Sequence, residues 1–248
     1  MMEKPYTPGF QLLILFGLTF LFQIIAQVVF QFVFANYQNN AEVENDTWVF
    51  LGGGLILQLF THLLAFFAFL RITGLSFSAV IDHQKLDWKK LMVLPIVVVA
   101  AILTVSFFTF ISSAIFESLE AFNYLDDEKA NQQKIQALLT HKDPLLLIYS
   151  IFVVGVVTAI GEELIYRGIL IKKLFEATYN KHFAIVISGL IFAAMHGHPV
   201  QIMPIAVMGI VFGYIYLYTR NIWYTVIIHF LFNTIQIIGV YFWPETMA

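Results

Sequence analysis

An all-α bundle of membrane-spanning helices is the fold class that this sequence predicts, and three observations predict it. Of the 248 residues, 60% are hydrophobic and only 12% are charged, whereas a typical soluble domain is about 25% charged. Apolar stretches recur along the whole chain, several of them near the roughly 20 residues that a helix needs to cross a bilayer. Charged residues gather in the segments between these stretches. The pattern indicates a polytopic membrane protein with about seven spans.

The spans follow from the apolar stretches in chain order. The first follows Lys4 and exceeds the core of a signal peptide, which has about 7 to 15 residues, so we interpret it as a retained span. The predicted spans are 10–34, 48–70, 91–116, 144–172, 183–196, 203–218 and 222–243, of which the fifth and sixth are short. With no internal repeat and no long linker, we expect one membrane domain over residues 1–248.

The charges of the connecting segments predict how the spans are oriented. Lys and Arg accumulate in cytoplasmic loops, and here basic segments alternate with acidic or uncharged ones. Basic residues mark segment 71–90, the region from Arg167 to Lys181, and Arg220, whereas segments 35–47 and 117–143 are acidic and 197–202 has no Lys or Arg. The alternation predicts a cytoplasmic N-terminus and an external C-terminus, and we expect an integral protein of the cell (plasma) membrane. Segment 117–143 also has the apolar spacing of a short external helix.

The composition excludes several functional classes. The chain has no cysteine and a formal net charge of −3. It therefore has no disulfide framework, no thiolate metal site and no cysteine nucleophile. Without a long basic run it also lacks the electrostatic footprint of a nucleic-acid-binding protein. We expect membrane lipid, and no nucleic acid, among its partners.

Two polar patches interrupt the first two spans. They consist of Gln23, Gln27 and Gln31 on the first span, and Gln58, Thr61 and His62 on the second. Hydrogen bonds between helices are the simplest role for such patches in a membrane. We therefore interpret the glutamines as packing contacts and His62 as a packing histidine rather than a ligand.

The stretch from Gly161 to Arg167 is the most unusual feature of the chain, because it puts two glutamates and an arginine into an apolar run. A charged side chain near the centre of a bilayer costs about 2.5 to 3.5 kcal/mol on insertion scales. Residues four apart share a helix face, so Glu163 and Arg167 are expected to form an ion pair. Glu162 points toward the side of Tyr166 and is free to meet groups from other helices.

Polar residues also recur at helical spacing in the later spans. Phe192 and His196 share one face, and His229 and Asn233 share another. Small residues that allow close helix packing accompany them, namely Gly189 with Ala193 and Gly209 with Gly213. These helices are expected to pack tightly around a common site.

Glu162, His196, His229 and Asn233 together would suit amide hydrolysis by an activated water. A carboxylate and an imidazole can take a proton from a shared water, which is worth about 10² to 10⁴ in rate. An imidazole and an amide can donate to an oxyanion, and losing one such donor costs about 10² to 10³ in turnover. Helical rise puts Glu162 and His229 about 14 Å from the cytoplasmic charges, whereas His196 comes out near 22 Å, which fits only a tilted or late-starting helix.

These motifs resemble those of the CAAX protease and bacteriocin-processing (CPBP, or Abi) family of intramembrane glutamate endopeptidases. The family's EExxxR, FxxxH and HxxxN motifs correspond to Glu162–Glu163–Arg167, Phe192–His196 and His229–Asn233, in the family's order. The resemblance covers about residues 151–237, and the first three spans match only in being hydrophobic.

The resemblance implies an all-helical endopeptidase acting on a membrane-associated or lipidated peptide or protein. Glu162 would activate water with help from His196, and His229 and Asn233 would be the oxyanion donors. Glu163 and Arg167 would organise the site, with Tyr166 and Phe192 beside them. In this interpretation residues 1–143 form N-terminal spans and 144–243 the catalytic core, with no cofactor.

Three alternatives remain open. A zinc ion could be held by Glu162, His196 and His229 with one open position, although the chain has no HExxH motif. The same three residues could form the relay of a proton-coupled transporter, although no inverted repeat supports this. A noncatalytic immunity or scaffold protein of the same family could also retain the motifs.

Overall fold

A computed structural model of the chain describes residues 6–38, 52–82, 84–139 and 143–243. Within these residues, six helices are long and apolar enough to cross a membrane, and Lys181–Ala194 is a shorter apolar helix. The predicted all-α membrane bundle of about seven spans is therefore confirmed. The sixth predicted span is longer than expected, because the helical segment runs over Pro199–Thr219.

The N-terminal half contains three of the spans. The first is α1 (Pro8–Gln38), and the second, Gly52–Thr73, includes the π-helical turn η1 (Leu59–Leu64) and α3 (Ala65–Thr73). After the short α4 (Phe77–Val80), the third span is α5 (Trp88–Ser118). The helix predicted within 117–143 is α6 (Phe122–Leu139). Most of the predicted acidic loop 35–47 lies outside the described residues.

The C-terminal half begins with a long, irregular span. It runs through α7 (Pro144–Ser150), η2 (Ile151–Val157), α8 (Thr158–Glu163), η3 (Leu164–Leu170) and α9 (Ile171–Thr178). It is followed by α10 (Lys181–Ala194), η4 (Pro199–Gln201), α11 (Ile202–Thr219) and α12 (Ile222–Phe242).

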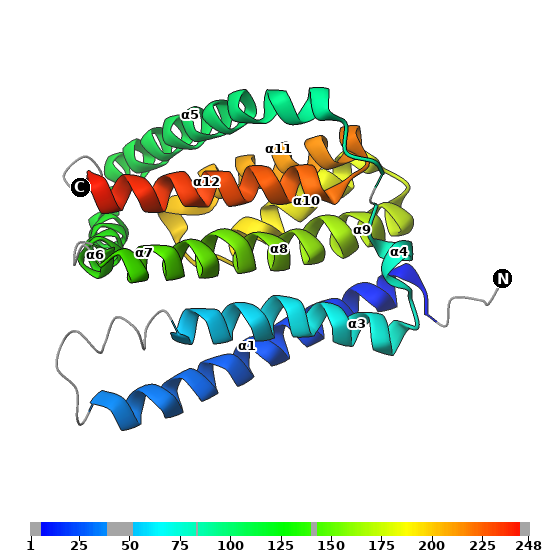
Figure 1. Cartoon of the computed structure of the whole chain (residues 1–248), viewed down its shortest axis with the longest axis horizontal. Helices are drawn as coiled ribbons and strands as arrows, with labels where there is room; N and C mark the ends of the chain where they lie inside the picture. Colours follow the sequence, from blue (N-terminus) through cyan, green and yellow to red (C-terminus); the bar gives the residue numbers. More distant parts are fainter. Residues whose placement is uncertain (1–5, 39–51, 83, 140–142, 244–248) are drawn as a thin grey trace.

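The helices form a layered bundle in which α1 and the second span lie as a pair beside α7–α9, and α5 lies on the opposite side (Figure 1). The start of α1, α4 and α9 lie at one end of the bundle, whereas α6 and the end of α12 lie at the other (Figure 1). The described helices therefore begin and finish at opposite ends, as an odd number of spans requires.

The predicted basic segments meet at one end of the bundle, around Asp82. Its Oδ1 lies 3.0 Å from Lys172 Nζ, and its Oδ2 lies 3.5 Å from Arg220 Nε. The Tyr216 hydroxyl donates to Oδ2 at 3.1 Å. Three segments that the charge pattern puts on one side are thus held together, while the assignment of that side to the cytoplasm stays a prediction.

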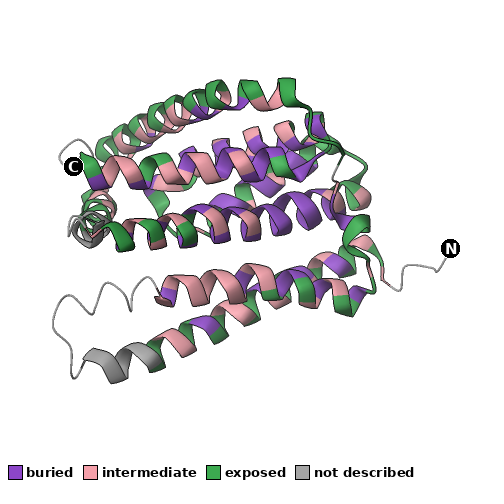
Figure 2. Cartoon of the chain, in the orientation of Figure 1, coloured by how far each residue is buried: buried purple, intermediate pink, exposed green. Residues whose placement is uncertain are grey.

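Burial concentrates in the C-terminal spans (Figure 2). In the most apolar window of Pro144–Thr178, 44% of residues are buried, against 17% for α1 and α5, so the fourth span is central and the other two are peripheral. The predicted close packing of small residues is confirmed, because a Cβ on Gly209 would lie 3.0 Å from the Cα of Gly189. Helices α10 and α11 therefore approach backbone to backbone next to the motif residues.

Candidate functional site

The fourth span departs from regular α-helix on both sides of the glutamate pair. The π-helical turns η2 and η3 flank α8, which ends with Glu162 and Glu163. Such turns are rare and occur often at functional sites. Two carbonyls of η2 accept hydrogen bonds from side chains: Thr158 Oγ1 donates to Val153 O at 3.0 Å, and Asn233 Nδ2 donates to Val154 O at 2.9 Å. The irregularity therefore ties α12 to the segment that carries the glutamates.

Glu163 and Arg167 form the ion pair that their spacing predicts. Arg167 Nη1 lies 2.9 Å from Glu163 Oε1, and both side chains are almost fully buried. Arg167 Nη2 also donates to the Gly209 carbonyl at 3.1 Å. Its guanidinium lies over the rings of Phe192 and Phe212, 5.1 and 5.4 Å from their centroids. Arg167 is thus positioned by an ion pair, a hydrogen bond and two aromatic rings, and it holds the Glu163 carboxylate in place.

His229 lies between the two carboxylates. Its Nδ1 is 3.0 Å from Glu163 Oε1, and its Nε2 is 3.7 Å from Glu162 Oε2. Since an ionised carboxylate only accepts hydrogen bonds, Nδ1 carries the proton that is donated to Glu163. The ring thus connects the two glutamates, with Nε2 turned toward Glu162.

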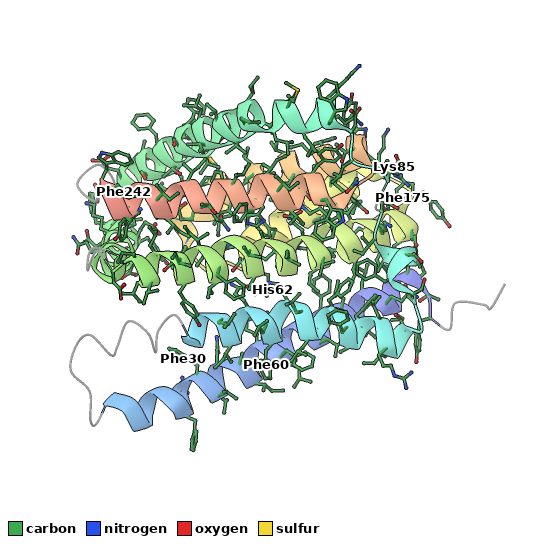
Figure 3. All side chains as sticks on the ribbon, in the orientation of Figure 1. Phe30, Phe60, His62, Lys85, Phe175 and Phe242 are labelled. Carbon is green, nitrogen blue, oxygen red and sulfur yellow. The ribbon has the colours of Figure 1, made fainter. Side chains whose placement is uncertain are left out.

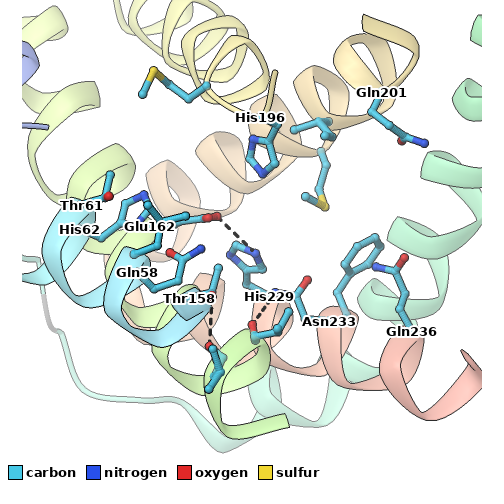
Figure 4. A pocket seen from close by; sticks show the side chains of 18 of the residues that line it. Gln58, Thr61, His62, Thr158, Glu162, His196, Gln201, His229, Asn233 and Gln236 are labelled. Atoms are coloured by element: carbon cyan, nitrogen blue, oxygen red, sulfur yellow. Dashed lines mark hydrogen bonds and ion pairs between the residues drawn. The ribbon is translucent and has the colours of Figure 1, made fainter. Parts of the chain in front are cut away.

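Glu162 faces a cavity of about 690 Å³, within the range of about 300 to 1,000 Å³ that is usual for ligand sites. The side chain is buried, and Oε2 makes no hydrogen bond within the described part of the chain. His196, His229 and Asn233 line the same cavity (Figure 4). The structure therefore brings together the four residues that were predicted to be catalytic.

His196 reaches the cavity from a turn, not from a helix face as the sequence predicted. Helix α10 ends at Ala194, and the His196 backbone N–H bonds the Ala193 carbonyl at 3.1 Å. His196 still contacts Phe192, because its Nδ1 lies 2.8 Å from the Phe192 carbonyl oxygen and must donate a hydrogen bond to it. In a neutral ring this leaves a lone pair on Nε2. The depth estimated along a straight helix does not apply to a residue in the turn.

Aromatic rings connect these groups. Tyr166, which lines the cavity, packs edge-on against Phe192 with centroids 4.8 Å apart. Phe192 in turn contacts His196 at 4.7 Å and is almost fully buried. The FxxxH phenylalanine is thus a spacer between the Arg167 guanidinium and the His196 ring.

The second span also lines the cavity, which sequence reasoning missed. Gln58, Thr61 and His62 line it, so the interpretation of His62 as a packing histidine needs correction. Gly161 explains how the spans meet, because a Cβ at that position would lie only 2.7 Å from His62 Cβ. A glycine directly before Glu162 was the one signal in the sequence for this close approach. Of the glutamine stripe on α1, Gln23 lines the cavity, and the other two are exposed.

The far end of the cavity is polar as well. Gln201, at the end of η4, donates to Glu128 Oε1 of α6 at 2.9 Å, and both residues line the cavity. Glu128 is half-buried there. Within residues 6–38, 52–82, 84–139 and 143–243, no group of three or more His, Cys, Asp or Glu side chains is arranged to hold a metal ion.

The C-terminal half of the chain is similar to known proteins. Residues 144–235 match the family described as Type II CAAX prenyl endopeptidase Rce1-like. A Bacillus subtilis (strain 168) protein named "Putative membrane peptidase YdiL" is 32% identical over 133 residues, covering 53% of this chain and 52% of that protein. The match thus spans about half the length of that relative, and no solved structure matches the chain.

The long apolar helices and the membrane-protein relative together identify an integral membrane protein. The family match falls on the segment that carries all three motifs, from the glutamate pair to Asn233. Residues 144–235 are therefore similar to the family described as Type II CAAX prenyl endopeptidase Rce1-like.

Proposed function

We propose that the protein is an intramembrane endopeptidase that hydrolyses a peptide bond of a membrane-associated or lipidated peptide or protein, using water activated by Glu162. The observation that carries this proposal is the position of Glu162. Its carboxylate is buried, has an oxygen without a hydrogen-bond partner among the described residues, and faces a cavity shared with two histidines and an asparagine.

The reaction uses Glu162 as the general base. A water held between Glu162 and the Nε2 of His196 gives a proton to the carboxylate, and its oxygen attacks the carbonyl carbon of the scissile bond. The negative charge that develops on the carbonyl oxygen is met by the Nε2–H of His229. When the C–N bond breaks, the proton passes from Glu162 to the leaving nitrogen. One water and one peptide bond give one carboxyl group and one amine.

Asn233 can supply only part of its donor capacity. One amide hydrogen is committed to the Val154 carbonyl at 2.9 Å, and the second N–H remains for the oxyanion. This bond to η2 also orients the amide. Asn233 is therefore the weaker of the two proposed oxyanion donors.

Glu163 and Arg167 act through His229 in this mechanism. Glu163 accepts from Nδ1 of His229 at 3.0 Å, which keeps Nε2 turned to the cavity. Arg167 neutralises Glu163 and holds it in place. They are positioning residues, as the carboxylate of a Ser-His-Asp triad is.

Similarity to known proteins supports the proposal but does not identify the substrate. The relative in Bacillus subtilis is named as a peptidase, and the family description names prenyl endopeptidases. The cavity wall mixes polar residues at the Glu162 end with apolar residues such as Val153, Ile205 and Val240. Such a wall suits an extended peptide with an apolar side chain or lipid attached.

Cleavage of a membrane-associated fluorogenic peptide by the purified protein tests the proposal. Glu162→Gln is expected to lower kcat by about 10² to 10⁴, because it removes the base and keeps the shape. Glu117→Gln makes the same change at an exposed site and should match the wild type. Circular dichroism and the unfolding midpoint verify that both variants fold. Equal cleavage by wild type and Glu162→Gln rejects the enzyme and leaves the transporter and scaffold alternatives.

We further propose that no metal takes part. The carboxylate and imidazoles already have roles as base and donors, and the described residues offer no three-ligand cluster. Activity should stay within about twofold after dialysis against EDTA or 1,10-phenanthroline, since in the proposed mechanism Glu162 and His196 activate the water without a metal. A loss of tenfold or more that added Zn²⁺ restores, with zinc found in the untreated protein, would establish the metal mechanism instead.

The proposed orientation has a direct test because the chain contains no cysteine. Lys85→Cys and Glu117→Cys introduce single thiols in segments of opposite predicted sidedness. In intact cells, a membrane-impermeant maleimide should label only the thiol at position 117. Labelling of position 85 alone would reverse the orientation.

A further inference from the structure

The second span presents a row of buried polar atoms to the Glu162 side of the cavity. Gln58 Oε1, Thr61 Oγ1 and His62 Nδ1 are all buried and make no hydrogen bond with the described residues. These positions are three and four residues apart and so share one helix face. A buried polar atom left without a partner costs about 1 to 3 kcal/mol, so three on one face require a functional explanation.

His62 is the member of this row that lies against Glu162. Gly161 allows the helices to approach so closely that a Cβ at position 161 would lie only 2.7 Å from His62 Cβ. His62 and Glu162 lie next to each other at the same end of the cavity (Figure 4). In the view of all side chains, His62 lies where the second span faces α8 (Figure 3).

His62 shares the cavity with the carboxylate and the two imidazoles of the proposed reaction site, those of Glu162, His196 and His229. Its turn, η1, is π-helical, as are the turns that flank the glutamates. All three π-helical turns of the described chain thus lie in the two spans that meet at Glu162.

The proposed reaction creates a conflict that His62 can resolve. Glu162 Oε2 lies 3.7 Å from His229 Nε2. If the two closed into a tight ion pair, Glu162 would lose basicity and His229 would lose the donor that the oxyanion needs. A second donor on the other side of the carboxylate would draw Glu162 away from His229 and leave both groups available.

We propose that His62 is a positioning residue that donates a hydrogen bond to the Glu162 carboxylate, directly or through one water, and so keeps it apart from His229. This inference rests on the proposed function. It makes the second span, which lies outside the matched segment 144–235, part of the working site. The N-terminal spans then contribute to catalysis as well as to membrane anchoring.

Kinetics of His62→Phe and His62→Gln test the role. His62→Phe keeps an aromatic ring without a donor, and it should lower kcat about 10- to 100-fold with KM within about threefold. His62→Gln restores an N–H and should recover at least about tenfold of that loss. His182→Phe is the matched control, because His182 bonds Tyr214 outside the cavity. Unchanged kcat in His62→Phe, an effect on KM alone, or no recovery in His62→Gln would overturn the proposal.

A spectroscopic test does not depend on cleavage. Protein labelled with ¹⁵N-histidine contains seven histidines, and the signals that disappear in His62→Gln identify His62. Glu162→Gln should shift the ring signals of His62, and Glu117→Gln should not. Unshifted signals would overturn the proposal, whereas absence of peptidase activity in the wild type would reject the proposed function alone. The two failures are therefore distinguishable.

Discussion

Replacement of Arg167 by methionine should be among the most destabilising single changes in the chain, because it leaves Glu163 charged and without its cation. Glu163 is fully buried and Arg167 nearly so. Removal of one partner of a buried ion pair costs about 3 to 5 kcal/mol. The Gly209 carbonyl also loses its donor at 3.1 Å, which adds about 1 kcal/mol. His229 remains bonded to Glu163 and offsets part of this, so we expect a net loss of about 4 kcal/mol.

A double-mutant cycle separates the charge from the packing. Glu163→Gln removes the charge that Arg167→Met exposes, so the double variant should be more stable than the sum of the single changes by about 2 kcal/mol or more. Reversible unfolding in mixed micelles with increasing SDS, followed by circular dichroism, measures each free energy. If Arg167→Met is as stable as the wild type, or if the two changes add without coupling, the guanidinium does not neutralise Glu163.

Two further changes test how the spans are held together. Gly161→Ala should cost about 1 to 3 kcal/mol of unfolding free energy and lower kcat, because the new Cβ would lie 2.7 Å from His62 Cβ. The control Gly17→Ala should be neutral or stabilising, because a Cβ there would have nothing within 4 Å. Equal effects of the two changes would refute the close approach of the helices at Gly161. Asp82→Asn should lower the unfolding free energy by about 1 kcal/mol, since it weakens the 3.0 Å contact with Lys172 at a partly exposed site. An unchanged SDS midpoint at low salt would contradict that contribution.

Helical spacing was enough to predict contacts within one span. The Glu163–Arg167 ion pair follows from local sequence, because residues three or four apart share a face. The same spacing predicted small-residue faces at Gly189 and at Gly209, but not that these two faces meet. Contacts between residues of distant spans could be predicted only from the motifs. His196 was misplaced because nothing in the apolar run shows that α10 ends two residues before it. His62 was undervalued because one polar residue in a span does not reveal which helix it faces.

Charge neutrality explains why the site is a chain of groups rather than a single glutamate. Arg167 compensates Glu163, Glu163 accepts from His229 Nδ1, and His229 Nε2 faces Glu162 at 3.7 Å. Each polar or charged group that would be costly to bury alone has a partner on a neighbouring residue in this series. Glu162 ends this series of contacts, and it is the one member that must change its charge during the proposed reaction. A reaction that begins by protonating Glu162 removes the partner of His229 at the moment when the oxyanion forms to replace it.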